Sequence, residues 1–239
     1  MTLYAGTSGW AYREWKPEFY PSDLPQKRWL DFYSCTLGAC EINATFYRLQ
    51  SEETLARWWA ETSEPFRFSL KMHRRITHSR SIEPDEPRIE LLKAFFDHAA
   101  KLGDKLGVVL LQFPPHRVRD DAALEALIAA LPPDGRYAFE FRNETWDSDE
   151  VRDRLAAAGA TICLSNTDGT APGALPPGAF AYVRLRTDVY EPDQRKAWRD
   201  LLIAAGRERD VFAFAKHEGI PAGNPYGGVG LAKWLAEEL

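Results

Sequence analysis

The chain has 239 residues, of which 45% are apolar and 27% charged, the composition of a globular protein with a sizeable core. Its formal net charge of −5 disfavours a general nucleic-acid coat protein, although a local basic cleft stays compatible with it. No apolar run approaches the roughly 20 residues that cross a bilayer. The N-terminal MTLYAGTSGW lacks a signal-peptide pattern, so we expect a cytoplasmic protein with no membrane partner.

Eight short segments rich in β-branched and aromatic residues recur along the chain and predict strands. They are 3–8, 40–47, 66–73, 107–113, 137–142, 161–166, 180–186 and 211–217. Helix-like segments lie between most of them, at 51–62, 87–103, 120–133, 148–159, 192–206 and 231–239. Because strands that alternate with helices form parallel sheets, eight such strands predict an α/β fold, a closed TIM-like (β/α)8 barrel.

Two intervals depart from this alternation. TDGTAPGALPPGA at 167–179 is too rich in proline and glycine for a regular helix, so we expect a gap in the outer helix ring between the sixth and seventh strands. The interval WAYREWKPEFYPSDLPQKRWLDFYS predicts an irregular loop over the barrel mouth, followed by a helix. Neither a repeat nor a linker divides the sequence, so we expect a single domain over 1–239.

Polar side chains stand late in nearly every predicted strand, mostly on one parity. They are Glu41, Asn43, Ser69, Lys71, His73, Gln112, Glu140, Arg142, Asn166, Arg184, Arg186 and Lys216. Active sites of such barrels lie at the C-terminal strand ends, whereas barrel interiors are normally packed with apolar side chains. Because a buried charge is costly unless it is paired or hydrated, this layer predicts a ligand cavity. The alternative is an ion-pair network that only fixes the fold.

The charged members of this layer indicate its chemistry. Glu41 and Glu140 can act as a general acid and a general base, one in each role, if their surroundings give them different pKa values. Lys71 can act as an amine nucleophile if it is desolvated, or it can hold an anion. Arg142, Arg184 and Arg186 suit a carboxylate or phosphate, which a guanidinium can bind with two parallel hydrogen bonds. The excess of cations favours a small anionic or phosphorylated ligand.

Other features of the sequence carry less information. The aromatic residues Trp10, Tyr47 and Trp146 can wall the mouth and stack on a ring, or can simply be packing. The glycines of YGGVG at 226–230 precede a predicted helix and can face a phosphate, or can form a plain flexible loop. No histidine motif for a metal is present, and a site assembled from Glu41, His73, Glu140 and His217 is disfavoured. We therefore expect no metal, and the sequence identifies no cofactor.

Six motifs follow one another in a familiar order: GTSGWAYREWKPEFYP, CEINATFYRL, FSLKMHRRITH, LLQFPP, FEFRNETW and AYVRLR. Together they resemble the DUF72 family, typified by the YecE-like proteins, over nearly the whole chain. The resemblance implies a TIM-barrel-like fold and leaves the activity undefined. The matching positions are Trp10, Glu41, Asn43, Phe46, Tyr47, Lys71, Thr77, His78, Gln112, Pro114, Glu140, Arg142, Trp146 and Arg184. The chain departs from the pattern at Arg186-Thr187 and at its C-terminal KHEGIPAGNPYGGVG.

These observations lead to one functional hypothesis with two alternatives. We expect an enzyme, a hydrolase, lyase or isomerase, that acts on a sugar phosphate, a nucleic-acid fragment or a similar anion. Its catalytic candidates are Glu41, Glu140 and Lys71. Its substrate-binding candidates are Trp10, Asn43, Tyr47, His78, Gln112, Arg142, Trp146 and Arg184. The alternatives are a non-catalytic module that binds nucleic acid or an anion, and a metal-dependent hydrolase or endonuclease.

Overall fold

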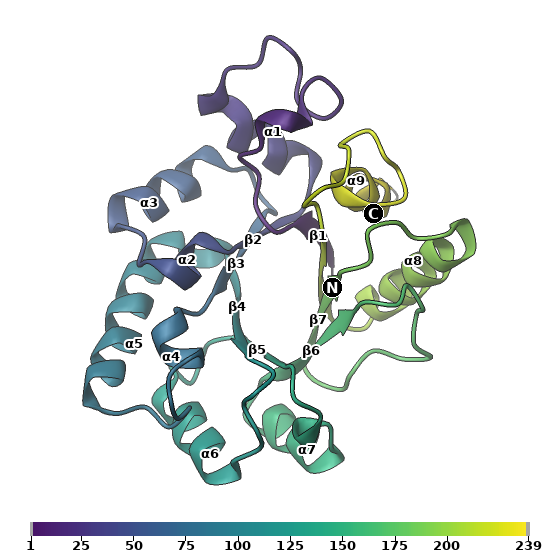
Figure 1. The fold of residues 1–239 in the computed structure, drawn as a ribbon. Helices are drawn as coiled ribbons and strands as arrows, with labels where there is room; N and C mark the ends of the chain where they lie inside the picture. The colour runs from purple at the N-terminus through teal and green to yellow at the C-terminus, as the bar shows by residue number, and fades with distance from the viewer. Residues whose placement is uncertain (1, 238–239) are drawn as a thin grey trace.

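The strands of the computed structural model, which describes residues 2–237, close into one parallel barrel in chain order (Figure 1). They are β1 (Leu3–Thr7), β2 (Ala39–Ile42), β3 (Arg67–Lys71), β4 (Leu106–Phe113), β5 (Tyr137–Phe141), β6 (Thr161–Asn166), β7 (Phe180–Leu185) and β8 (Asp210–Ala215). β8 pairs with β1 along the whole of β1, from Leu3 opposite Val211 to Thr7 opposite Ala215. The predicted TIM-like barrel is confirmed.

Helices surround the barrel on its outside (Figure 1). They are α1 (Trp29–Thr36), α2 (Ala44–Tyr47), α3 (Glu52–Glu61), α4 (Arg74–Thr77), α5 (Glu86–Ala99), α6 (Asp121–Ala130), α7 (Asp149–Ala157), α8 (Pro192–Gly206) and α9 (Gly228–Ala236). Side chains of Ser51, Asp85, Asp120 and Ser148 cap four of them by accepting a backbone N–H of the first turn. In the described chain, the connection from β6 to β7 contains no helix, as its proline and glycine content predicted.

β2 and β3 end earlier than their sequence pattern indicates, and each is followed by a short helix. β2 stops at Ile42, because Asn43 already has helical angles and α2 follows at once. Thr45 then donates its hydroxyl to the carbonyl oxygens of Ile42 and Lys71, at 2.8 and 2.7 Å, and so ties the ends of β2 and β3 together. β3 stops at Lys71, and His73 Nδ1 accepts the N–H of Arg75 at the start of α4. Short helices at the mouth therefore replace the predicted ends of both strands.

The C-terminal glycines serve close backbone packing. α9 begins at Gly228, three residues before the predicted start. A Cβ atom on Gly227 would lie 2.0 Å from the carbonyl oxygen of Asp188, and one on Gly230 would lie 2.2 Å from that of Asn224. Because real Cβ atoms cannot approach backbone this closely, the glycines are explained by the fold without a bound phosphate.

The inside of the barrel is divided into an apolar layer and a polar layer. The apolar layer fills the N-terminal half, where Tyr4 stacks on Phe212 with ring centroids 4.9 Å apart. The polar layer lies above it, where strand pairing sets Glu41 opposite Ser69 and Gln112 opposite Glu140. The apolar layer thus forms a rigid floor beneath the polar side chains.

Within residues 2–237, no helix is long and apolar enough to cross a membrane.

Candidate functional site

Arg184 holds two carboxylates together at the buried centre of the polar layer. Its Nη1 lies 2.7 Å from Glu140 Oε2, and its Nη2 lies 2.9 Å from Glu41 Oε1. All three side chains are at most 3% exposed. A group buried this deeply depends on each of its members, because loss of one leaves an uncompensated charge in the interior. Three of the predicted site residues therefore form one ionic cluster.

Two hydroxyl groups complete the surroundings of Glu41. Ser8 Oγ donates to Glu41 Oε1 at 2.7 Å, and Tyr182 Oη donates to Glu41 Oε2 at 2.8 Å. Burial raises the pKa of Glu41, but the guanidiniums of Arg184 and Arg186 and the two hydroxyls outweigh it and lower this pKa to about 2. Glu41 is therefore ionised at neutral pH. Neither Ser8 nor Tyr182 was predicted, although Tyr182 stands two residues before Arg184 and so shares its face of the strand.

A hydrogen-bonded chain connects Glu140 to Lys71. Gln112 Nε2 donates to Glu140 Oε2, and Lys71 Nζ donates to Gln112 Oε1, both at 2.8 Å. Burial raises the pKa of Glu140, but Arg184, Gln112 and Arg142 outweigh it, so the net pKa is lowered. Burial and the charge of Arg184 lower the pKa of Lys71 to about 8. Lys71 therefore changes protonation close to the pH at which most enzymes work.

Cations outnumber carboxylates around this network. Arg142 Nε lies 3.1 Å from Glu140 Oε1, and the Arg142 side chain is 48% exposed. Arg186 Nη1 lies 3.3 Å from Ser8 Oγ, and its Nη2 lies 3.8 Å from the exposed Glu218. The two buried carboxylates thus face four cations: Lys71, Arg142, Arg184 and Arg186. With Glu218 included, this group has four cations against three carboxylates, so it is cationic even though the chain as a whole is acidic.

A cavity of about 720 Å³ opens at the C-terminal ends of β5 and β6. It exists because these strands pair only through Ala138 with Thr161 and Phe139 with Ile162, and then separate. Its lining includes three cations and three carboxylates, namely Arg142, Arg152, Arg186, Glu140, Glu144 and Asp147. The separation of two strands therefore connects the buried network to the outside.

The two predicted tryptophans pack against neighbouring side chains. Trp146 is buried, stacks on Phe141 with ring centroids 4.2 Å apart, and donates Nε1–H to the Arg117 carbonyl at 2.8 Å. Trp10 packs edge-on against Trp58 at 5.1 Å. Trp146 also lines the cavity between β5 and β6. A ligand contact for either indole stays a prediction.

The remaining predicted residues flank Lys71 on the outer side of the mouth. The Phe46 ring lies 4.3 Å from Lys71 Nζ, and its edge meets the His78 ring at 4.9 Å. Tyr47, next along α2, is 67% exposed. Asn43 precedes α2, and its buried Oδ1 has no hydrogen-bond partner within the described part of the chain. The motif CEINATFY is thus a strand followed by a short helix that carries aromatic rings to the rim.

The exit of β8 reverses a predicted orientation. The sequence places Lys216 on the inward parity and His217 outside, but β8 ends at Ala215, so the strand alternation does not reach them. Lys216 forms an ion pair with Asp188. His217 is buried instead, with its ring 4.2 Å from that of Tyr12. Tyr12, which belongs to the loop over the mouth, therefore packs against His217.

Metal-ligand clusters are not found in the described structure. Among residues 2–237, no group of three or more His, Cys, Asp or Glu side chains could hold a metal ion. Glu41 and Glu140 are bound by Arg184, and His73 Nδ1 accepts a backbone N–H. The residues considered for a metal are thus spread over separate contacts.

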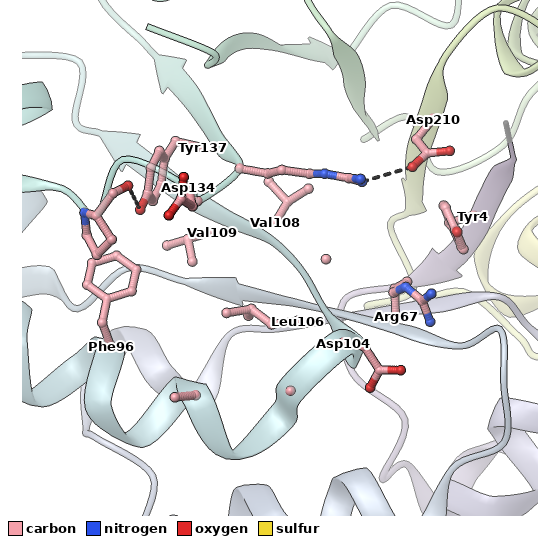
Figure 2. A pocket seen from close by; sticks show the side chains of 16 residues that line it. Tyr4, Arg67, Phe96, Asp104, Leu106, Val108, Val109, Asp134, Tyr137 and Asp210 are labelled. Atoms are coloured by element: carbon pink, nitrogen blue, oxygen red, sulfur yellow. Dashed lines mark hydrogen bonds and ion pairs between the residues drawn. The ribbon is translucent and has the colours of Figure 1, made fainter.

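A second cavity, of about 490 Å³, lies at the N-terminal ends of the strands (Figure 2). Arg136 Nη1 lies 2.9 Å from Asp210 Oδ2 there, and Arg67 Nη1 lies 2.8 Å from Glu64 Oε2. Tyr137 donates its hydroxyl to the Pro132 carbonyl at 2.7 Å. The two arginines therefore each have a carboxylate of their own, whereas Arg142 and Arg184 at the mouth share Glu140.

Comparison with other sequences connects this chain to proteins of one family. Residues 4–236 match the family model described as "Protein of unknown function DUF72". The UPF0759 protein YunF of Bacillus subtilis (strain 168) is 26% identical over 218 residues, which cover 83% of this chain and 76% of YunF. The UPF0759 protein YecE of Escherichia coli (strain K12) is 26% identical over 142 residues, which cover 59% of this chain and 48% of YecE.

Solved structures show the same fold. A DUF72 family protein from Thermotoga maritima MSB8 superposes with a TM-score of 0.75 at 19% identity, over 99% of this chain and 98% of its own. A DUF72 family protein from Enterococcus faecalis V583 superposes with a TM-score of 0.71 at 17% identity, over 98% of each chain. At these identities the likeness concerns the fold alone. Because the family model spans nearly the whole sequence, this chain belongs to the DUF72 family.

Proposed function

We propose that this protein is an enzyme that binds a small anionic or phosphorylated substrate at the mouth of its barrel. The cation excess at the mouth carries the proposal. Glu41 and Glu140, together with Glu218 beside Arg186, carry three negative charges against the four positive charges of Lys71, Arg142, Arg184 and Arg186. An anion beside these cations would lower the electrostatic free energy of the whole site.

Arg142 and the unpartnered polar atoms supply the contacts for such an anion. Arg142 uses Nε on Glu140, which leaves its two terminal nitrogens without a partner among residues 2–237. A guanidinium with free terminal nitrogens suits a phosphate or a carboxylate. Ser69 Oγ and Arg184 Nε are buried and likewise lack a hydrogen-bond partner in the described chain. Unsatisfied buried groups of this kind call for an explanation, and a bound substrate is one.

Lys71 is the best candidate for the chemical step. A lysine with a pKa of about 8 is partly neutral at physiological pH and can accept a proton or attack a carbonyl carbon. Glu41 and Glu140 stay ionised, and their carboxylate oxygens already accept hydrogen bonds. This favours a positioning role, in which the two glutamates hold Arg184 and Gln112 in place. Such chemistry suits a lyase or an isomerase. The earlier assignment of the two glutamates as acid and base stays a prediction.

The first test measures thermal unfolding with phosphate, sugar phosphates and nucleotides. A ligand at about 100 times its Kd adds about 2.7 kcal/mol, which raises the Tm of a chain of this size by about 5–10 °C. We expect such a shift with one phosphorylated class, and expect Arg142→Ala to remove most of it. Arg136→Ala, which removes an arginine at the other end of the barrel, is the matched control. A shift that Arg142→Ala retains, or no shift with any anion, contradicts the proposal.

The second test uses the pKa of Lys71. The amine attracts an anion while it is protonated, so affinity should fall as the pH rises through about 8. Between pH 7.5 and 9 a phosphate monoester, whose second pKa is about 6, keeps its charge, so the change comes from the protein. Lys71→Arg keeps the positive charge and should flatten the profile. Equal slopes for the two proteins in a titration calorimeter would remove Lys71 from the binding site.

A further inference from the structure

An open groove of about 930 Å³ lies beside the mouth, along α4 and the start of α5. Its described lining carries four arginines, Arg74, Arg75, Arg80 and Arg88, against one carboxylate, Asp85. The chain as a whole has a formal net charge of −5. The groove is therefore a local concentration of positive charge on an acidic protein, and we call it the arginine groove.

Two arginines, Arg88 in the groove and Arg117 further along the sequence, hold the turn at 79–81 through hydrogen bonds. Arg88 Nε lies 2.9 Å from Asp85 Oδ1, and its Nη1 donates to Ser79 Oγ at 2.6 Å. Arg117, from the loop after β4, donates to the carbonyl oxygens of Ser79 and Arg80. These bonds hold the turn at 79–81 in place. The groove is thus preorganised, which lowers the entropic cost of binding.

Three other arginines are exposed and available. The side chains of Arg74, Arg75 and Arg80 form no ion pair with a carboxylate in the part of the chain that the structure describes. An exposed guanidinium without a carboxylate partner is suited to phosphate oxygens. Three of them along one groove match a ligand that carries several negative charges in a row.

The arginine groove continues into the mouth of the barrel. The His78 ring meets the edge of Phe46 at 4.9 Å, and the Phe46 ring lies 4.3 Å from Lys71 Nζ. Burial lowers the pKa of His78, and so do positive charges from both directions, namely Lys71, Arg74, Arg142 and His116. One positive field therefore joins the groove to the cavity.

The exposed ring of Tyr47 indicates which class of polyanion fits the arginine groove. Its ring is 67% exposed and lies 5.0 Å from that of Phe46, beside the same path. A large exposed aromatic ring next to cations is the combination on which unpaired bases stack while phosphates bind. In a duplex the base faces are covered by their neighbours, so a single strand fits better. An acidic peptide or inorganic polyphosphate would make no use of this ring.

We propose that the arginine groove binds a single-stranded nucleic acid, with its phosphates on Arg74, Arg75 and Arg80 and a base stacked on Tyr47. One end of the strand then points toward Lys71 and Arg142. The three arginines are not part of the small-anion site, so this inference goes beyond the proposed function and does not require turnover.

The experiment measures fluorescence anisotropy of a 3′-labelled twelve-residue oligothymidylate, and of its RNA counterpart, between 50 and 200 mM salt. We expect Arg74→Ser/Arg75→Ser/Arg80→Ser to weaken binding about tenfold or more, and to reduce the slope of log K against log salt by about 2, or about 0.7 for each phosphate contact. Tyr47→Ala should weaken binding about tenfold through lost stacking. The matched control, Lys27→Ser/Lys196→Ser/Arg207→Ser, removes three exposed charges elsewhere and should leave affinity nearly unchanged.

Several outcomes would overturn the inference. Equal losses in the two triple variants would mean that the protein attracts oligonucleotides without a site. An unchanged affinity in Tyr47→Ala, together with full competition by inorganic polyphosphate or polyglutamate, would assign the groove to another polyanion. Arg142→Ala separates the two proposals, because it should remove the thermal shift with small phosphates and retain most of the oligonucleotide affinity.

Discussion

The two ends of the barrel both join arginines to carboxylates, but in opposite surroundings. At the C-terminal end, Arg184 contacts Glu41 and Glu140, and none of the three side chains is more than 3% exposed. At the N-terminal end, Arg136 contacts Asp210 with the side chains 47% and 22% exposed (Figure 2). The same pair of functional groups is thus buried at one end and hydrated at the other, where water screens it.

The comparison shows why a cavity alone does not identify a site. Both ends have one, of about 720 Å³ at the C-terminal end and about 490 Å³ at the N-terminal end. At the N-terminal end Arg67 and Arg136 each have a carboxylate partner. At the C-terminal end two buried carboxylates meet four cations. What distinguishes the C-terminal end is the buried ionic network beside its cavity, in which cations outnumber carboxylates, and not empty volume.

The largest effect should follow from removal of the shared arginine. Arg184→Met leaves Glu41 and Glu140 buried without their common counter-charge, and breaking such a buried network costs about 3–5 kcal/mol. We expect the free energy of unfolding in urea to fall by this amount and Tm to fall by about 6–20 °C. The triple variant Glu41→Gln/Glu140→Gln/Arg184→Met removes all three charges and should recover part of the loss. A loss below about 1 kcal/mol in the single variant would show that water reaches the cluster.

A smaller effect should appear in acid. The folded pKa of Glu41, about 2, lies below the ordinary glutamate pKa of 4.5, so Glu41 contributes stability above pH 4.5 that is lost as the pH falls toward 2. At pH 3 the loss attributable to Glu41 should be about 2 kcal/mol, and the lowered pKa of Glu140 adds to it in the same direction.

Other carboxylates also titrate in this range, so Arg184→Met serves as the reference. Without the guanidinium the two folded-state pKa values rise, and this part of the acid dependence should shrink or change sign. Urea unfolding at pH 6 and pH 3 measures it in both proteins. Parallel curves for wild type and Arg184→Met would show that the depressed pKa of Glu41 does not depend on Arg184.

The sequence was sufficient for the parts of the site that follow from strand periodicity. Eight apolar segments alternating with helices determine a barrel, because few other arrangements cover both faces of a parallel sheet. Within a strand, side chains alternate, so Glu41, Gln112, Glu140 and Arg184 could be assigned to one interior layer before any coordinates were known. Lys71, the last residue of β3, follows the same rule.

The rule fails where the chain leaves the sheet. Strand parity predicts Asn43 and His73 within strands, but each stands at the start of a short helix, where a local hydrogen bond or a helical backbone angle decides its direction. His217 replaces Lys216 on the inner side for the same reason. The arginines of RRITHSR are visible in the sequence, but their exposure and their lack of carboxylate partners depend on the packing of α4 against α5. The orientation and exposure of the residues at the rim of the barrel therefore could not be predicted from the sequence.

The smallest effect should come from the N-terminal end. Arg136→Ala removes one member of a half-exposed ion pair, and such pairs contribute about 0–1 kcal/mol. The remaining Asp210 stays partly hydrated, so no buried charge is left uncompensated, unlike the carboxylates in Arg184→Met. Urea unfolding of the two single variants under the same conditions measures the contrast directly. If Arg136→Ala cost more than about 2 kcal/mol, burial would not explain the difference between the two ends. The N-terminal ion pair would then no longer serve as a control for the proposal that the charges at the mouth bind a ligand.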